Sequence, residues 1–357
     1  MAEHTGDYEW RSEGEEAEIV LFSPDEGSAD PGIQRTLPAA RLPGAESPVY
    51  AATSSEGFGW VAASSTHAAP DLTSIPRRGV LIVADAEAGD LDVPPNDILP
   101  FLMRNLSEVG LPHLDGSGVR RMCESGAIAA AEDALIEEED LDSFVSSAGD
   151  PDALGRRAIS AGYRDWEIRP RELGVKVVGE TFDAEAAEEL GLRPGTLVFV
   201  LDVGAGNLGR LALTAHRERI AGRDFGREGV PAAPVETEEA ADLLSAFGAV
   251  SNFVDGRAAL LVYALRRALS GAAGRLSVPA AWRVGGIEED GGLLVHRNTL
   301  AAVGDEQIIT AGGNVTAGTG NMSGNAPPFG APEDDGRWPW EEAGLLERLV
   351  GLDDPRG

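Results

Sequence analysis

The pattern of apolar and polar positions is most distinctive at Leu197–Arg210, which reads LVFVLDVGAGNLGR. Five apolar or β-branched residues come first, followed by Asp202 and then by Gly204, Gly206 and Gly209. A short apolar run that breaks into glycines is typical of a buried strand entering a tight turn, because glycine tolerates positive φ angles and close backbone approach. The pattern therefore predicts a core strand followed by a glycine turn, and such turns often hold a functional group.

The remaining hydrophobic pattern predicts a mixture of strands and helices. Short β-type runs predict strands near 79–84, 174–178, 293–297 and 307–311. Apolar residues at intervals of three or four predict helices near 97–106, 128–135 and 252–269. Thr237 is a predicted helix N-cap, because Glu238 and Glu239 follow it in the first turn. These elements predict an α+β fold, a single domain of several packed β-sheets flanked by helices.

The two ends of the chain differ in composition from the part between them. Residues 1–30 are polar, acidic and punctuated by glycine, which is typical of a peripheral or loosely ordered segment. Residues 31–325 form the expected folded domain, although residues 151–173 are charged and irregular. Residues 326–357 contain Pro, Asp and Trp and are expected to form a short acidic C-terminal segment that ends in an amphipathic helix.

Charge is strongly one-sided, since 60 acidic residues against 29 basic ones give a formal net charge of −31. Lys176 is the only lysine, so the cations are almost all arginine. Nucleic-acid affinity depends on Lys and Arg that neutralise phosphates, so this balance argues against a broad, non-specific nucleic-acid surface. At molar salt the Debye length falls to about 3 Å and self-repulsion is screened, so the composition favours a halophilic protein.

Cysteine content and apolar run length exclude two further classes. Cys123 is the only cysteine, which rules out a disulfide within the chain and a zinc site built on several cysteines, and we expect an inert thiol there. The N-terminal residues lack an apolar signal region, and no apolar run approaches the roughly 18 residues that span a bilayer. The sequence therefore predicts a soluble, cytoplasmic protein without a membrane partner.

The Asp-x-Gly-x-Gly pattern that starts at Asp202 is similar to the first motif of S-adenosylmethionine-dependent methyltransferases. That alternative predicts a second strand about twenty residues after the turn, ending in an acidic residue that binds a ribose. Asp224 is acidic, but no apolar run precedes it. A methyltransferase therefore stays an alternative, to be tested by the strand order around the glycine turn.

Four motifs occur in a fixed order along the chain. The acidic stretch TFDAEAAEELGL precedes the central strand, the glycine turn Asp202–Arg210 follows it, Ser251–Phe253 lies at the start of a predicted helix, and the strand motif SVPAAWRVGGIEEDGGLLVHRNT covers Ser277–Thr299. In this order the chain resembles, from about residue 32 to residue 325, the RtcB family of RNA ligases. That family joins RNA 3′-phosphate or cyclic-phosphate ends to 5′-hydroxyl ends, so the resemblance implies an RtcB-like fold.

The resemblance also indicates which functional groups this chain lacks. Family members hold two manganese ions through an Asp, a Cys and several His, and carry GMP on a further His within Cys-His-Gly-Ala-Gly-Arg, a motif that this sequence does not contain. At matching positions the chain keeps the carboxylates Asp71 and Asp202, but Ser74 replaces the Cys, and Pro170–Arg171 and Ala280–Ala281 replace pairs that include His. Two carboxylates predict at most one weakly held divalent cation, such as manganese. Without the nucleotide-accepting His, no residue is assigned a catalytic role.

Four further residues match family positions, and by the resemblance they are candidates to bind a guanine nucleotide or a phosphate: Asn252, His296, Arg297 and Thr316. An Arg beside a His suits a phosphate, whereas the structural alternative for His296 is a strand-end histidine held by local hydrogen bonds. The sequence thus predicts a divergent RtcB-like protein without RNA ligase activity that binds RNA ends, another phosphate-bearing ligand or a protein partner. The alternative is an active or residual RNA 3′-phosphate/5′-hydroxyl ligase of tRNA splicing or RNA repair.

Overall fold

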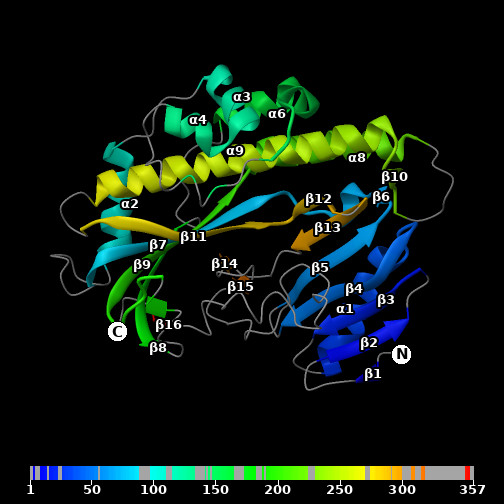
Figure 1. Cartoon of the computed structure of the whole chain (residues 1–357), viewed down its shortest axis with the longest axis horizontal. Helices are drawn as coiled ribbons and strands as arrows, with labels where there is room; N and C mark the ends of the chain where they lie inside the picture. The colour runs from blue at the N-terminus through cyan, green and yellow to red at the C-terminus, as the bar shows by residue number, and fades with distance from the viewer. Residues whose placement is uncertain are drawn as a thin grey trace.

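The fold was analysed in a computed structural model, which describes residues 3–4, 9–13, 16–22, 26–54, 57–87, 97–109, 115–132, 141, 144, 147–164, 173–181, 187–188, 190–223, 230–269, 274–290, 292–299, 307–309, 315–317 and 350–353. Within these ranges the chain combines antiparallel sheets with helices, and a long helix lies across one of the sheets (Figure 1). The predicted α+β class is therefore confirmed, while the finer RtcB-like assignment stays a prediction.

The central sheet has the strand order β11-β7-β9-β8-β16, and its neighbouring strands are all antiparallel. The strands are β7 (Arg77–Glu87), β8 (Leu173–Thr181), β9 (Thr196–Gly204), β11 (Leu276–Val284) and β16 (Val350–Asp353). The predicted core strand is β9, in which residues 196–203 are all buried. A strand covered on both faces has no polar alternation, which explains its continuous apolar run.

This strand order bears on the methyltransferase alternative. Strand β9 lies between β7 and β8 and is antiparallel to both. A doubly wound nucleotide-binding sheet needs parallel strands on the two sides of the glycine turn, joined by crossover helices. The central sheet therefore lacks, in its described strands, the arrangement that a methyltransferase requires.

Helix α9 (Glu238–Ala268) lies on one face of the central sheet and shares the main hydrophobic core with it (Figure 1). It begins after the predicted N-cap, where Thr237 Oγ1 accepts a hydrogen bond from Ala240 N at 3.3 Å. Helices α3 (Gly116–Ser125) and α4 (Ala127–Glu132) cover its opposite side. Because both sides are covered, α9 is buried around most of its circumference, and it begins well before the residue 252 predicted from its apolar stripe.

Helix α6 (Gly155–Arg164) follows the short helix η4 (Pro151–Leu154) and packs against α8 (Gly206–Ala221). A Cβ atom on Gly162 would lie 2.5 Å from Leu208 Cδ1 and 3.1 Å from Val119 Cγ1, so a residue as small as glycine favours this close helix crossing. The structure thus places a regular helix in a stretch expected to be irregular, because its many arginines obscure the small buried face. Helix α2 (Ile98–Val109), predicted at 97–106, packs against α9.

The N-terminal sheet has the order β1-β2-β3-β4-β5-β13-β12 and carries α1 (Glu26–Ala40). Its strands are β1 (Glu3–His4), β2 (Glu9–Glu13), β3 (Glu18–Phe22), β4 (Ala45–Ser54), β5 (Gly57–Ser65), β12 (Gly286–Asp290) and β13 (Leu293–Thr299). Ile19 and Leu21 of β3 are fully buried, so residues 9–13 and 18–22 belong to the sheet instead of forming a peripheral segment. Acidic residues lie on both sides of this short apolar run. The composition of residues 1–30 as a whole is therefore polar and does not indicate the strand.

Smaller elements complete the described chain. They are the pair β6 (His67–Ala68) and β10 (Ala233–Pro234), the short helix η1 (Pro70–Leu72), and the pair β14 (Gln307–Ile309) and β15 (Val315–Ala317). Near the C-terminus the structure has the strand β16 where an amphipathic helix was expected, while residues 318–349 and 354–357 lie outside the described ranges. Within those ranges no helix combines the length and apolarity needed to cross a bilayer.

Candidate functional site

The glycine turn joins β9 to α8. Gly206, the first residue of α8, has φ 55°, a left-handed conformation that favours glycine. A Cβ atom on Gly209 would lie 2.4 Å from Ile75 Cγ2 and 2.8 Å from Ala205 Cβ, so glycine is also required for helix packing there. Backbone geometry and packing therefore account for these two glycines of the motif without a bound cofactor.

The two candidate metal ligands each pair with an arginine. Asp202 is buried near the end of β9 and forms an ion pair and hydrogen bond with Arg77 of the neighbouring strand β7. Asp71 in η1 forms an ion pair with Arg217 of α8. Within the described residues there is no group of three or more His, Cys, Asp or Glu side chains that could hold a metal ion. At both positions an arginine guanidinium therefore compensates the negative charge of the carboxylate. By the resemblance, a metal cation would have this role.

Asn252 lies fully buried in α9, and its side chain connects three chain segments. Its Nδ2 donates to the carbonyl oxygens of Cys123 and Glu124 at 3.1 Å each and to that of Ser147 at 2.9 Å. Its Oδ1 accepts from Ser147 N at 2.7 Å. The amide thus caps the C-terminal end of α3 and fixes the segment at Ser147. These hydrogen bonds give the Asn252 side chain a structural role.

His296 is fully buried in β13 and has both ring nitrogens engaged by the backbone. Its Nε2 accepts from Ala69 N at 2.9 Å, and its Nδ1 lies 3.2 Å from Ala63 O, to which it donates in the matching neutral tautomer. Burial lowers the pKa of His296 to about 4. A neutral imidazole with both ring nitrogens hydrogen-bonded corresponds to the structural alternative for His296, a strand histidine held by hydrogen bonds.

The remaining predicted residues are placed by their backbone. Arg297 follows His296 in β13, opposite Ala62 of β5 and Gly286 of β12, and Thr316 lies opposite Ile308 in the pair of β14 and β15. Positions 170 and 171, where the resemblance implies the loss of an Asn-His pair, lie outside the described ranges. Cys123 is buried, and burial raises the pKa of its thiol to about 12, which fits the expected inert thiol.

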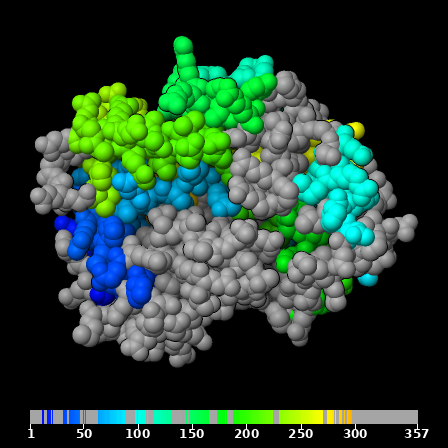
Figure 2. Space-filling view, turned by 180° about the vertical axis from the view of Figure 1, so that it is seen from behind, coloured from blue at the N-terminus to red at the C-terminus, as the bar shows by residue number. Residues whose placement is uncertain are grey.

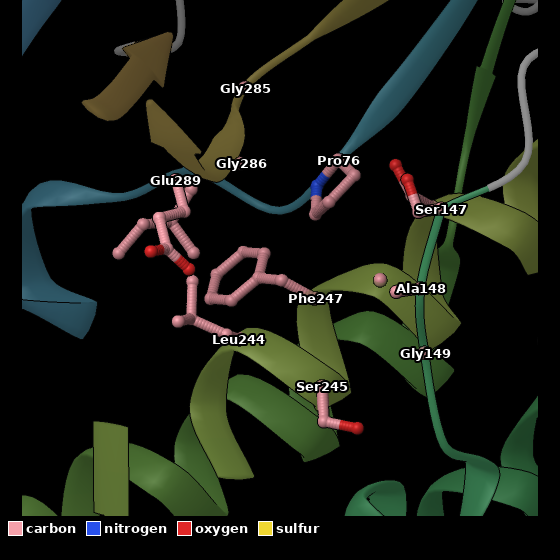
Figure 3. A pocket seen from close by; sticks show the side chains of 13 residues that line it. Pro76, Ser147, Ala148, Gly149, Leu244, Ser245, Phe247, Gly285, Gly286 and Glu289 are labelled. Atoms are coloured by element: carbon pink, nitrogen blue, oxygen red, sulfur yellow. The ribbon is translucent and has the colours of Figure 1, made fainter. Parts of the chain in front are cut away.

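A pocket of about 580 Å³ opens between the middle of α9, the extended residues 147–149 and the turn at Gly285–Gly286 (Figure 3). Backbone approach builds one wall, because a Cβ atom on Gly248 would lie 1.9 Å from Ala148 O. The Phe247 ring projects from α9 toward β12, where Glu289 supplies the carboxylate among the lining side chains. The pocket's described lining residues include serines but no histidine, and no hydrogen bond between a lining serine and Glu289 is defined, so they do not form a recognisable nucleophile–base pair.

A second hollow, of about 470 Å³, lies between α6 and the first turns of α8, on a face where the two helices lie together (Figure 2). It is lined by Arg156, Arg157, Ser160, Ala161, Arg164, Asn207, Arg210 and Leu211, and we call it the arginine hollow. Arg210 donates to Asn207 Oδ1 from Nε at 3.2 Å and from Nη2 at 2.9 Å, which orients its guanidinium. Among the described residues no carboxylate pairs with these four arginines, although the chain carries a net charge of −31.

The arginine hollow includes two residues of the glycine-turn motif, Asn207 and Arg210, and its other three arginines come from residues 151–173, which were expected to be irregular. The signal was present in GRRAISAGYR at Gly155–Arg164, where Arg156 and Arg164 are two helical turns apart and share a face. In comparisons with known proteins, the chain matches no family model and has no significant match among curated proteins. Function must therefore be argued from the geometry of this hollow and from the resemblance alone.

Proposed function

We propose that this chain is a divergent RtcB-like protein that binds a phosphate-bearing ligand, RNA ends among them, and does not join RNA. The observation that carries the proposal is the arginine hollow beside the glycine turn. Guanidinium groups bind phosphate through charge-assisted, often bidentate hydrogen bonds, and the first turn of α8 adds backbone N–H groups of the same polarity. Ala205, the N-cap of α8, supplies no side-chain hydrogen bond that competes for these groups.

The absence of ligation is supported by what the matching residues do in the fold. Asp202 pairs with Arg77, the Asn252 amide is saturated by backbone groups, and His296 is neutral with both nitrogens engaged. A covalent nucleotidyl intermediate needs a nucleophile, and the motif that carries it in the family does not occur in this sequence. Removing a nucleophile removes the two-step pathway as a whole, so no graded residual activity is expected.

The acidic surface is compatible with a phosphate site when salt is high. At about 1 M salt the Debye length is roughly 3 Å, so carboxylates elsewhere on the surface contribute little to the potential in the hollow. A direct guanidinium–phosphate contact acts at hydrogen-bond distance, so its charge-assisted hydrogen bonds add a short-range attraction. The site is therefore expected to select anions locally while the rest of the surface repels them.

Two measurements test this proposal. Incubation with labelled GTP and manganese in molar KCl, followed by denaturing electrophoresis, should leave the protein unlabelled, and a labelled band would refute the inactive assignment. Calorimetric titration with inorganic tripolyphosphate should show binding that Arg210→Gln weakens. The matched control is Arg193→Gln, which removes an exposed arginine paired with Glu188 on the loop before β9 and should leave binding unchanged. Equal losses in the two variants, or no binding at all, would contradict a phosphate site in the hollow.

A further inference from the structure

The arginines of the arginine hollow are spread along α6 and onto α8. Arg156 and Arg164 lie eight residues apart on α6, which corresponds to roughly 12 Å along the helix axis. Arg157 and Arg210 lie between these ends and on the facing helix. A run of successive phosphates matches this spread of arginines better than a single phosphate group does.

An exposed aromatic side chain flanks the hollow. Tyr163 is 41% exposed, and Tyr163 and Ile128 are the large hydrophobic side chains exposed in the described part of the chain. On α6 it lies in the same row as Arg156 and Ser160, at helical spacings of seven and three residues. Exposed aromatic rings beside arginines are the combination that proteins use to bind single-stranded nucleic acids, in which bases stack on the ring and the backbone follows the positive charge.

We infer that the arginine hollow and Tyr163 form a site for the interior of a single nucleic-acid strand, with successive phosphates on the arginines and a base stacked on Tyr163. This inference rests on the proposed phosphate binding and specifies its ligand. Because the contacts are to backbone and base face, the site does not require a terminal phosphate and does not select a base sequence.

The packing of α6 on α8 holds these groups in place. Ala158, Ile159 and Gly162 of α6 are buried, and Gly162 sets the close approach to Leu208. Arg156, Arg157, Tyr163 and Arg164 are exposed residues of the same helix, outside its buried face. Asp152 in η4 is an acidic residue that lies close to Arg156 along the chain. Its carboxylate is already paired with Arg120, at 2.6 Å.

The test is fluorescence anisotropy of a labelled twelve-nucleotide RNA strand, over a series of KCl concentrations. Tyr163→Leu, which keeps the bulk and removes the ring, should weaken binding about tenfold or more, whereas Tyr163→Phe should stay within about twofold. Arg164→Gln should weaken binding and reduce the slope of log affinity against log salt by about one. Arg193→Gln is again the matched control, and strands with 3′-phosphate and 3′-hydroxyl ends should bind equally.

The outcomes separate this inference from the proposed function. If Tyr163→Leu binds RNA as tightly as the unchanged chain while Arg164→Gln weakens RNA and tripolyphosphate alike, the hollow binds phosphate but the stacking site is refuted. Binding that needs the 3′-phosphate also refutes an interior-strand site. If neither RNA nor tripolyphosphate binds at any salt concentration, the proposed phosphate binding itself fails.

Discussion

Asn252 offers the sharpest test of whether a family-matched residue serves structure or ligand binding. Its alanine variant loses the contacts of the two Nδ2 hydrogens with three carbonyl oxygens and one accepted hydrogen bond, all with backbone groups. Each such bond contributes about 1 kcal/mol net, and buried partners left without a hydrogen bond cost more. We therefore expect Asn252→Ala to lower the free energy of unfolding by about 3–5 kcal/mol, a large share of the roughly 5–15 kcal/mol of a typical domain.

The assay is urea unfolding in molar KCl, followed by far-UV circular dichroism, with the midpoint and the m-value compared between variants. The matched control is Asn105→Ala, because the Asn105 amide donates to Ala268 O at 3.1 Å and should cost only about 1 kcal/mol. Asn252→Asp keeps the acceptor for Ser147 N but sets a carboxylate against carbonyl oxygens, so it should be less stable still. A loss of unfolding free energy for Asn252→Ala no greater than that for Asn105→Ala would refute the structural role of Asn252.

Four further predictions follow from buried or closely packed groups and from charge. Stability should fall by up to about 3 kcal/mol between pH 6.5 and pH 4, because the folded-state pKa of His296 lies below its unfolded value, and His296→Gln should flatten this part of the profile. Asp255→Ala should cost about 3–5 kcal/mol by removing the carboxylate that pairs with the buried Arg78, and urea midpoints should show a smaller loss when both are replaced by apolar residues; additive losses would count against the pair. Gly209→Ala should destabilise the fold by about 1–3 kcal/mol. Gly204→Ala should cost less in the same assay, because a Cβ atom added there meets no atom within 4 Å. Thermal melting temperatures should rise as KCl increases to molar levels, and melts indifferent to salt would remove the halophile argument.

Sequence patterns predicted the elements whose burial is uniform. Residues 79–84 and 197–203 lie within β7 and β9, interior strands of the central sheet that are covered on both faces, so their apolar runs are unbroken. Thr237 was predicted as an N-cap because its signal is local. The pattern missed β3 and α6, where a short buried face is flanked by acidic residues or interrupted by arginines.

The roles of the candidate site residues could not be predicted in the same way, because their partners are distant in sequence. The Asn252 amide contacts backbone groups 105 to 129 residues away, and Ala69 N reaches His296 from 227 residues away. A motif match identifies the position of such a residue but not which groups surround its side chain. The arginine hollow has the same origin, since two helices separated in the chain by β8 and β9 bring its guanidiniums together.

Arginine gives these observations a common physical interpretation. The carboxylates that the resemblance assigns to a metal site, Asp71 and Asp202, are paired with Arg217 and Arg77. A guanidinium is permanently charged and covalently part of the fold, so it compensates a carboxylate without any dependence on metal supply. Such a pairing preserves the packing around the strand ends but withdraws the ligands from chemistry. Arginines that pair with no described carboxylate, as in the hollow, are then the places where we propose that a strongly acidic chain attracts an anion.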